Sequence, residues 1–168
     1  EPAAAPSALP LEAVLVWPAG EWRVEKDGRS LGRAETSASG DLIRHTLRYE
    51  LGRGGSSPFV ALVTDEVGAM RDASRLAFSA AADRPMRLSV QVRLVDGTSE
   101  RRWQRSVYLS PDPREIIVPF ADMRVAGTGE RGAFAPARID SLLFVVDSVN
   151  AKPGDRGVVW LERLRTER

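Results

Sequence analysis

Residues 86–120 read MRLSVQVRLVDGTSERRWQRSVYLSPDPREIIVPF and carry the strongest structural signal in the chain. From Leu88 to Leu94, apolar and polar residues alternate with a period of two, which is typical of a strand with one buried and one exposed face. Segments 102–109 and 115–120 follow, after a turn at 96–98 and a Pro-Asp-Pro loop. We therefore predict an antiparallel meander of three consecutive strands.

Similar short patterns recur on both sides of this stretch. Residues 65–74 and 121–123 offer a single helical turn each, and 125–138 reads as a Gly-rich loop. Further strands are predicted at 11–17, 22–24, 43–51, 59–64, 76–80, 141–147 and 157–164. Because so many short antiparallel strands must stack or close to bury their apolar faces, we predict an all-β fold of two packed antiparallel sheets.

Length and composition indicate one domain. The chain has 168 residues, enough for one core and few for two. Residues 1–10 are rich in Pro and Ala and resemble a linker, so we predict a single domain over 11–168. Such a linker often follows a removed signal or a membrane anchor. The prediction is therefore an extracytoplasmic protein, periplasmic or secreted, with tethering through this linker left open.

The nearly equal numbers of acidic and basic residues bear on which partners are expected. The formal net charge is +1, and the basic cluster at Arg101, Arg102 and Arg105 adjoins Glu100. Since the chain as a whole has no field to attract polyanions, nucleic acid is not an expected partner. No apolar run approaches the roughly 20 residues that span a bilayer, so no membrane span is predicted.

The order of predicted elements resembles the jelly-roll sandwiches of the galactose-binding-domain-like superfamily. The similarity is to family 11 carbohydrate-binding modules and to the complex I intermediate-associated protein 30 family. The residues that carry it are 42–51, 74–80, 88–94, 115–123 (EIIVPFADM) and 139–164. The resemblance implies a two-sheet antiparallel jelly-roll β-sandwich that binds a ligand, commonly carbohydrate, on a sheet face or at an edge, without catalysis.

One departure from the family concerns calcium. The family's final strand often carries an Asp that sometimes contributes to a structural calcium site, whereas this chain has Glu162 followed by Arg163. No cofactor is predicted, and a structural calcium ion is doubtful here.

The hairpin within residues 86–109 supplies the candidate ligand site. If Arg93 lies opposite Trp103, then Gln91 lies opposite Arg105, and one exposed face carries an indole, two guanidinium groups and an amide. A sugar suits this mixture, because its C–H face stacks on an aromatic ring and its hydroxyls bond to planar polar groups. A shift of one residue would instead bury Trp103 and expose Tyr108.

Other aromatic and titratable residues are weaker candidates. Trp22 and Trp160 lie near strand ends, where they would line an edge pocket or pack in the core. His45, the single histidine, falls on the apolar face of its strand, and cysteine is absent. Because this leaves little material for metal or nucleophilic catalysis, the chain is not predicted to be an enzyme.

Two functions remain open at this point. The first is a carbohydrate-binding or carbohydrate-sensing module that takes an oligosaccharide or polysaccharide through Trp103, Arg93, Arg105 and Gln91. The second is a structural or protein-interaction domain that uses the same frame to dock a neighbouring protein domain. An exposed Trp103 in a polar groove would favour the first, and a flat apolar patch or an open sheet edge the second.

Overall fold

Strands dominate the computed structural model, which describes residues 13–16, 20–55, 57–130 and 132–168. The elements within these residues are β1 (Ala13–Val16), β2 (Arg23–Lys26), β3 (Leu31–Ser39), β4 (Leu42–Glu50), β5 (Phe59–Thr64), η1 (Gly68–Met70), β6 (Arg75–Ala82), β7 (Met86–Asp96), β8 (Ser99–Leu109), β9 (Arg114–Pro119), η2 (Phe120–Asp122), β10 (Arg124–Val125), η3 (Pro136–Arg138), β11 (Ile139–Asp147) and β12 (Arg156–Glu167). The three η elements are single 3₁₀ turns. The predicted linker, residues 1–10, lies outside the described residues.

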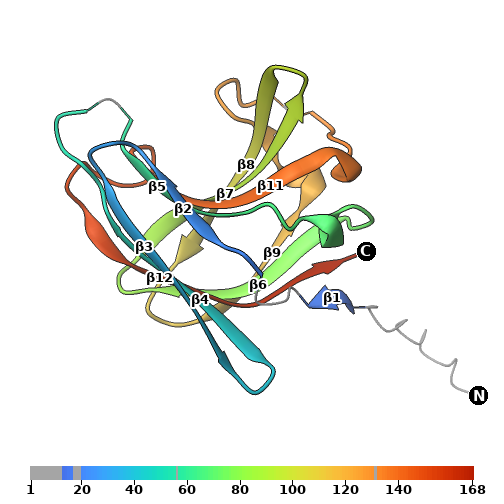
Figure 1. The fold of residues 1–168 in the computed structure, drawn as a ribbon, viewed down its shortest axis with the longest axis horizontal. Helices are drawn as coiled ribbons and strands as arrows, with labels where there is room; N and C mark the ends of the chain where they lie inside the picture. Colours follow the sequence, from blue (N-terminus) through green and yellow to red (C-terminus); the bar gives the residue numbers. More distant parts are fainter. Residues whose placement is uncertain (1–12, 17–19, 56, 131) are drawn as a thin grey trace, which may run out of the picture.

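The strands form two antiparallel sheets that face each other (Figure 1). Sheet A has the order β3-β4-β12-β6-β9, with β1 paired to β12. Sheet B has the order β10-β8-β7-β11-β5-β2. The prediction of an all-β sandwich of two antiparallel sheets is confirmed.

The main core fills the space between the sheets, and the period of two explains which side chains enter it. On β4, His45, Leu47 and Tyr49 are buried, as their alternation predicts. Strand β11 is apolar at nearly every position because both of its faces are covered. Phe144 packs in the main core, while Leu143 belongs to a second, smaller cluster on the opposite side of sheet B.

The predicted three-strand meander is wrong at its third strand. Strands β7 and β8 form the expected hairpin, but β9 pairs with β6 in sheet A. The Pro111-Asp112-Pro113 loop between β8 and β9 ends the β8 ladder, since proline has no N–H to donate, but it does not by itself select a hairpin or a crossing to the other sheet. The Ser110 carbonyl accepts a hydrogen bond from the Ala82 N–H at 3.0 Å, which directs the chain to sheet A.

Two strands, β3 and β10, were not predicted from the sequence. Strand β3 reads LGRAETSAS, which has few of the β-branched and aromatic residues that mark strands. Strand β10 is a two-residue pairing with β8 beside the predicted Gly-rich loop. In the part of the chain that the structure describes, no helix has the length and apolar character needed to cross a bilayer.

Candidate functional site

The side of sheet B that points away from sheet A, called here the outer face, gathers polar side chains from five strands. Strand register places Gln91 of β7 between Gln104 of β8 and Leu143 of β11 on this side. By the same alternation, the polar residues of the outer face include Arg23, Glu25, Arg87, Ser89, Gln91, Arg93, Glu100, Arg102, Gln104, Ser106, Tyr108, Arg124, Ser141 and Asp147.

The predicted hairpin register is wrong by one residue. Asp96 pairs with Ser99 across a two-residue loop, so Arg93 lies opposite Arg102 and Trp103 lies opposite Val92. Gly97 in this loop has φ +63°, a conformation that glycine adopts without strain. Because strand side chains alternate between faces, the one-residue difference turns Trp103 toward the core.

Trp103 is 6% exposed and packs in the main core. Its ring lies 5.3 Å from that of Phe134, and its Nε1–H donates a hydrogen bond to the Gly132 carbonyl at 3.2 Å. Tyr108 is 43% exposed, with the Arg114 guanidinium 5.6 Å from its ring centre. The predicted place of Trp103 on an exposed sheet face is therefore wrong.

The other three predicted site residues lie near the outer face. Gln91 and Arg93 belong to it by register. Arg105 instead pairs with Val90, so it shares its strand face with Trp103 rather than with Gln91. It is nevertheless exposed and lines the same cleft as Gln104 and Ser106.

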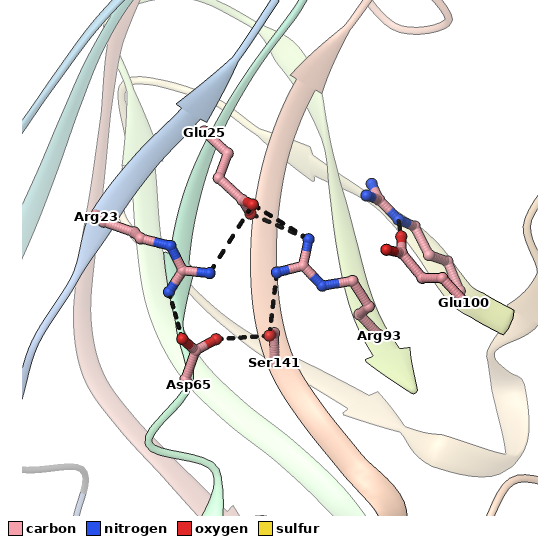
Figure 2. A network of polar contacts seen from close by, with 7 residues as sticks. Arg23, Glu25, Asp65, Arg93, Glu100 and Ser141 are labelled. Atoms are coloured by element: carbon pink, nitrogen blue, oxygen red, sulfur yellow. Dashed lines mark hydrogen bonds and ion pairs between the residues drawn. The ribbon is translucent and has the colours of Figure 1, made fainter. Parts of the chain in front are cut away.

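At one end of the outer face, called here the closed end, five polar side chains satisfy one another (Figure 2). Arg93 Nη1 lies 3.2 Å from Glu25 Oε2, and Arg93 Nη2 donates to Ser141 Oγ at 3.2 Å. The Ser141 hydroxyl donates to Asp65 Oδ1 at 2.7 Å, and Arg23 Nη1 donates to Asp65 Oδ2 at 2.7 Å. The Ser141 hydroxyl, with Arg23, holds the pKa of Asp65 below its ordinary value.

The closed end also covers an apolar strip. The Arg93–Glu25 pair joins β7 to β2 across β11 and β5, where Ala61, Val63 and Leu143 are almost fully buried on the outer side. Long side chains such as Arg can shield apolar surface with their methylene stems. The closed end is therefore a structural lid over this strip, built of paired charges.

Gln91 lies between the two ends of the outer face and is 5% exposed. Its Nε2 donates to Ser89 Oγ at 3.1 Å and lies 3.5 Å from Gln104 Oε1. Its Oε1 is buried and has no hydrogen-bond donor among the described residues. A buried carbonyl without a donor is costly, so Gln91 carries a local stability cost beside Ser89 and Gln104.

The opposite end of the outer face, called here the open end, contains a cleft of about 370 Å³. Arg87 is held at its wall, because Nε donates to Ser106 Oγ at 2.8 Å and Nη2 to the Ser106 carbonyl at 3.4 Å. The lining residues are Arg87, Ser89, Gln104, Arg105, Ser106, Asp122, Arg124, Gly129, Asp147, Val149 and Asn150. Among the described residues, Arg87, Arg105 and Arg124 have no carboxylate within 4.0 Å.

Two acids, Asp122 and Asp147, also line the cleft, but neither carboxylate lies within 4.0 Å of these arginines. Asp147 Oδ1 accepts the Val149 N–H at 3.1 Å, and burial raises the pKa of the Asp147 carboxyl above its ordinary value. Asn150 lines the same side, and Val149 is 86% exposed at the rim. The cleft thus offers guanidinium donors, carboxylate and amide acceptors, and one small apolar contact.

His45 and Trp22 contribute to the core instead. His45 is 2% exposed, its ring centre lies 4.6 Å from that of Trp22, and its Nδ1 lies 3.0 Å from Thr36 Oγ1. Burial lowers the pKa of His45 to about 4, so the ring is neutral at pH 7. In the described part of the chain, no cluster of three His, Cys, Asp or Glu side chains is arranged to hold a metal ion.

Several pockets lie on sheet A, and two of them hold an arginine cluster or a tryptophan. One, of about 470 Å³, includes Arg33, Arg48, Arg84 and Arg156. These arginines are partly engaged, since Arg33 Nε lies 3.2 Å from Glu35 and Arg84 Nε lies 3.6 Å from Asp83. The other, of about 250 Å³, places Trp160 beside two prolines and the Arg44–Glu162 ion pair.

Sequence reasoning missed most residues of the cleft. Arg87 and Ser89 continue the polar side of the predicted strand and could have been included from that pattern alone. Their partners on β8 depended on the hairpin register. Asp122, Arg124 and Asn150 come from turns and short pairings far along the chain, and their convergence has no local signal in the sequence.

Comparisons with known proteins support the fold. No family model and no curated protein sequence matches the chain. A family 11 carbohydrate-binding module of the cellulosomal cellulase Lic26A-Cel5E of Clostridium thermocellum is similar in structure, with a TM-score of 0.68, 14% identity and 95% of each chain covered. The Clostridium thermocellum family 11 module in complex with a β-1,3-1,4-mixed-linked tetrasaccharide gives 0.66 at 13% identity, covering 89% of this chain and 91% of the other.

A family 30 carbohydrate-binding module has a TM-score of 0.55 at 14% identity, with 86% of this chain and 76% of that chain covered. At these identities the likeness establishes architecture. The predicted jelly-roll resemblance is confirmed.

Proposed function

We propose that this chain is a non-catalytic carbohydrate-binding module of an exported protein, with its ligand in the cleft at the open end of the outer face. The observation that supports this most is the cleft itself, whose arginines have no carboxylate within 4.0 Å among the described residues. Planar polar side chains held in fixed positions suit the many hydroxyls of a sugar ring.

Structural similarity adds support from a second direction. One similar module was solved with a mixed-linked tetrasaccharide. The proposed contacts differ from those predicted from the sequence, because Trp103 is in the core. Arg87 and Gln104 replace Trp103 as the main ligand contacts, Arg105 lies at the margin, and Gln91 contacts the cleft residues Ser89 and Gln104.

The protein-interaction alternative has less to support it. The exposed large apolar side chains are spread over β3, β7, β8, β9 and the β11–β12 turn (Leu31, Val95, Tyr108, Ile117 and Val149). The edge strand β3 carries Arg33 and Glu35 on its exposed side, and such charges discourage pairing with another chain.

Affinity electrophoresis against a panel of neutral and acidic polysaccharides tests the proposal. The wild-type chain should be retarded by at least one polymer, and Arg87→Ala with Gln104→Ala should abolish the retardation. The matched control, Arg33→Ala, alters an exposed arginine of sheet A and should leave it unchanged. Retardation by no polymer, or retardation lost only in Arg33→Ala, would refute the proposal.

A further inference from the structure

We infer that the saccharide taken by the open-end cleft is acidic, with a carboxylate or sulfate ester bound between Arg87 and Arg124. The inference rests on the proposed function, since it names the chemical class of ligand for the same cleft. Three features of the cleft support it: the lack of a stacking ring, the unmatched guanidinium groups and the position of the acids.

Described aromatic side chains of the outer face do not line the cleft. Phe59 packs against the small apolar cluster beneath the closed end, and the Arg114 guanidinium lies over the ring of Tyr108. The cleft therefore lacks the ring on which the C–H face of a neutral sugar would stack. A ligand held here must gain its affinity mainly from polar contacts.

The arginines of the cleft are arranged for an anion. At the closed end, Arg23 and Arg93 each lie within 4.0 Å of a carboxylate, whereas Arg87 and Arg124 have none among the described residues. Arg87 is fixed through Nε and Nη2 by Ser106, which leaves Nη1 available. A planar guanidinium already held in position binds carboxylate or sulfate oxygens strongly, because little side-chain entropy remains to be lost.

The acids of the cleft favour an acidic sugar over a simple polyanion. Asp122 and Asp147 lie in the same cleft and would repel a chain with charge at every unit. They would accept hydrogen bonds from hydroxyl groups. The complementary ligand has one anionic group at the arginines and hydroxyls directed to Asp147 and Asn150.

Calorimetric titration of the full chain with matched ligand pairs tests the inference. Each pair carries a single anionic group: the carboxylate pair is a xylan-derived tetrasaccharide with one glucuronate residue and its methyl ester, and the sulfate pair is a singly sulfated carrageenan tetrasaccharide and its desulfated form. The acidic member of at least one pair should bind roughly tenfold or more tightly than the neutral member, as expected for charge-assisted hydrogen bonds. The pair that shows the difference identifies the anionic group.

Variants that remove one guanidinium charge test whether the preference for the acidic ligand arises in the cleft. Arg87→Gln and Arg124→Gln should each reduce binding of the acidic member about tenfold, toward that of the neutral one. Arg71→Gln, a matched change at an exposed arginine outside the cleft, should have no effect. Circular dichroism of each variant verifies folding.

The possible failures can be told apart. If a neutral ligand binds as tightly as its acidic partner and Arg87→Gln weakens both equally, the inference is wrong while the proposed function stands. If Arg71→Gln weakens binding as much as Arg87→Gln, the attraction is non-specific and the inference is wrong. If no saccharide binds, the proposed function fails together with the inference.

Discussion

The closed and open ends of the outer face use the same residue types for opposite purposes. At the closed end, Arg93 reaches across β11 and β5 to Glu25 of β2, and the apolar strip below the network is almost fully buried (Figure 2). At the open end, Arg87 is fixed by Ser106 but meets no carboxylate among the described residues. Completed pairs indicate a stabilising role, whereas a positioned but unpaired guanidinium in a cleft indicates binding.

The largest expected effect comes from the core beneath the open end. Trp103→Ala removes a buried indole and should lower the free energy of unfolding by about 3–5 kcal/mol, measured by urea denaturation. Since Val125 of β10 pairs with Trp103, the variant should also loosen the strand that carries Arg124. Tyr108→Ala is the matched control, and an equal loss in both would contradict the core position of Trp103.

The next largest effect is the difference in stability between alanine variants of Arg93 at the closed end and Arg87 at the open end. Arg93→Ala should cost about 1–3 kcal/mol, because it leaves Glu25 and Ser141 without their donor. Arg87→Ala should change stability by less than about 0.5 kcal/mol, as is usual for an exposed residue, and should weaken binding of the acidic saccharide about tenfold. The comparison fails if Arg87→Ala is the more destabilising of the two.

A smaller effect is the opposite pH dependence of stability that we expect from two aspartates, Asp65 at the closed end and Asp147 at the open end. The lowered pKa of Asp65 means that its carboxylate stabilises the fold above the ordinary Asp pKa, and that this stability is lost as pH falls through the lowered value. The raised pKa of Asp147 means that its charged form is disfavoured in the folded state, so stability increases as pH falls through the raised value.

Thermal unfolding at pH 7 should therefore distinguish the two Asp→Asn variants. Asp65→Asn should lower the melting temperature, and Asp147→Asn should raise it. Asn keeps an oxygen that can accept the Val149 N–H at position 147, so the second change removes charge with little loss of hydrogen bonding. Shifts of the same sign would show that the two carboxyls do not differ as described.

Local patterns were sufficient to predict the sandwich. The alternation of β4 and β7, the apolar run of β11 and the turn residues between them specify strands and buried faces without any knowledge of distant contacts. The transfer of β9 to sheet A was missed, since a Pro-Asp-Pro loop is equally compatible with a hairpin and with a crossing between sheets.

The site was harder to predict because it depends on register. The Gly97-Thr98 loop reverses the expected orientation of Trp103, and one residue of register decides between a surface and a core side chain. Gln91 and Arg93 lie on the outer face in either case, because they belong to the clean alternation of β7. The arginine that faces the cleft, Arg87, is distinguished from Arg93 only by partners on distant strands.

The most direct test is backbone and side-chain amide NMR of the chain during titration with the acidic tetrasaccharide that binds most tightly. We expect the largest shifts at Ser89, Gln104, Ser106 and Asn150, and at the Gln91 side-chain amide, whose Nε2 contacts Ser89 and Gln104. Shifts centred on Arg33, Arg48 and Gly157 would place the ligand in the sheet A pocket and contradict the assignment of the open end.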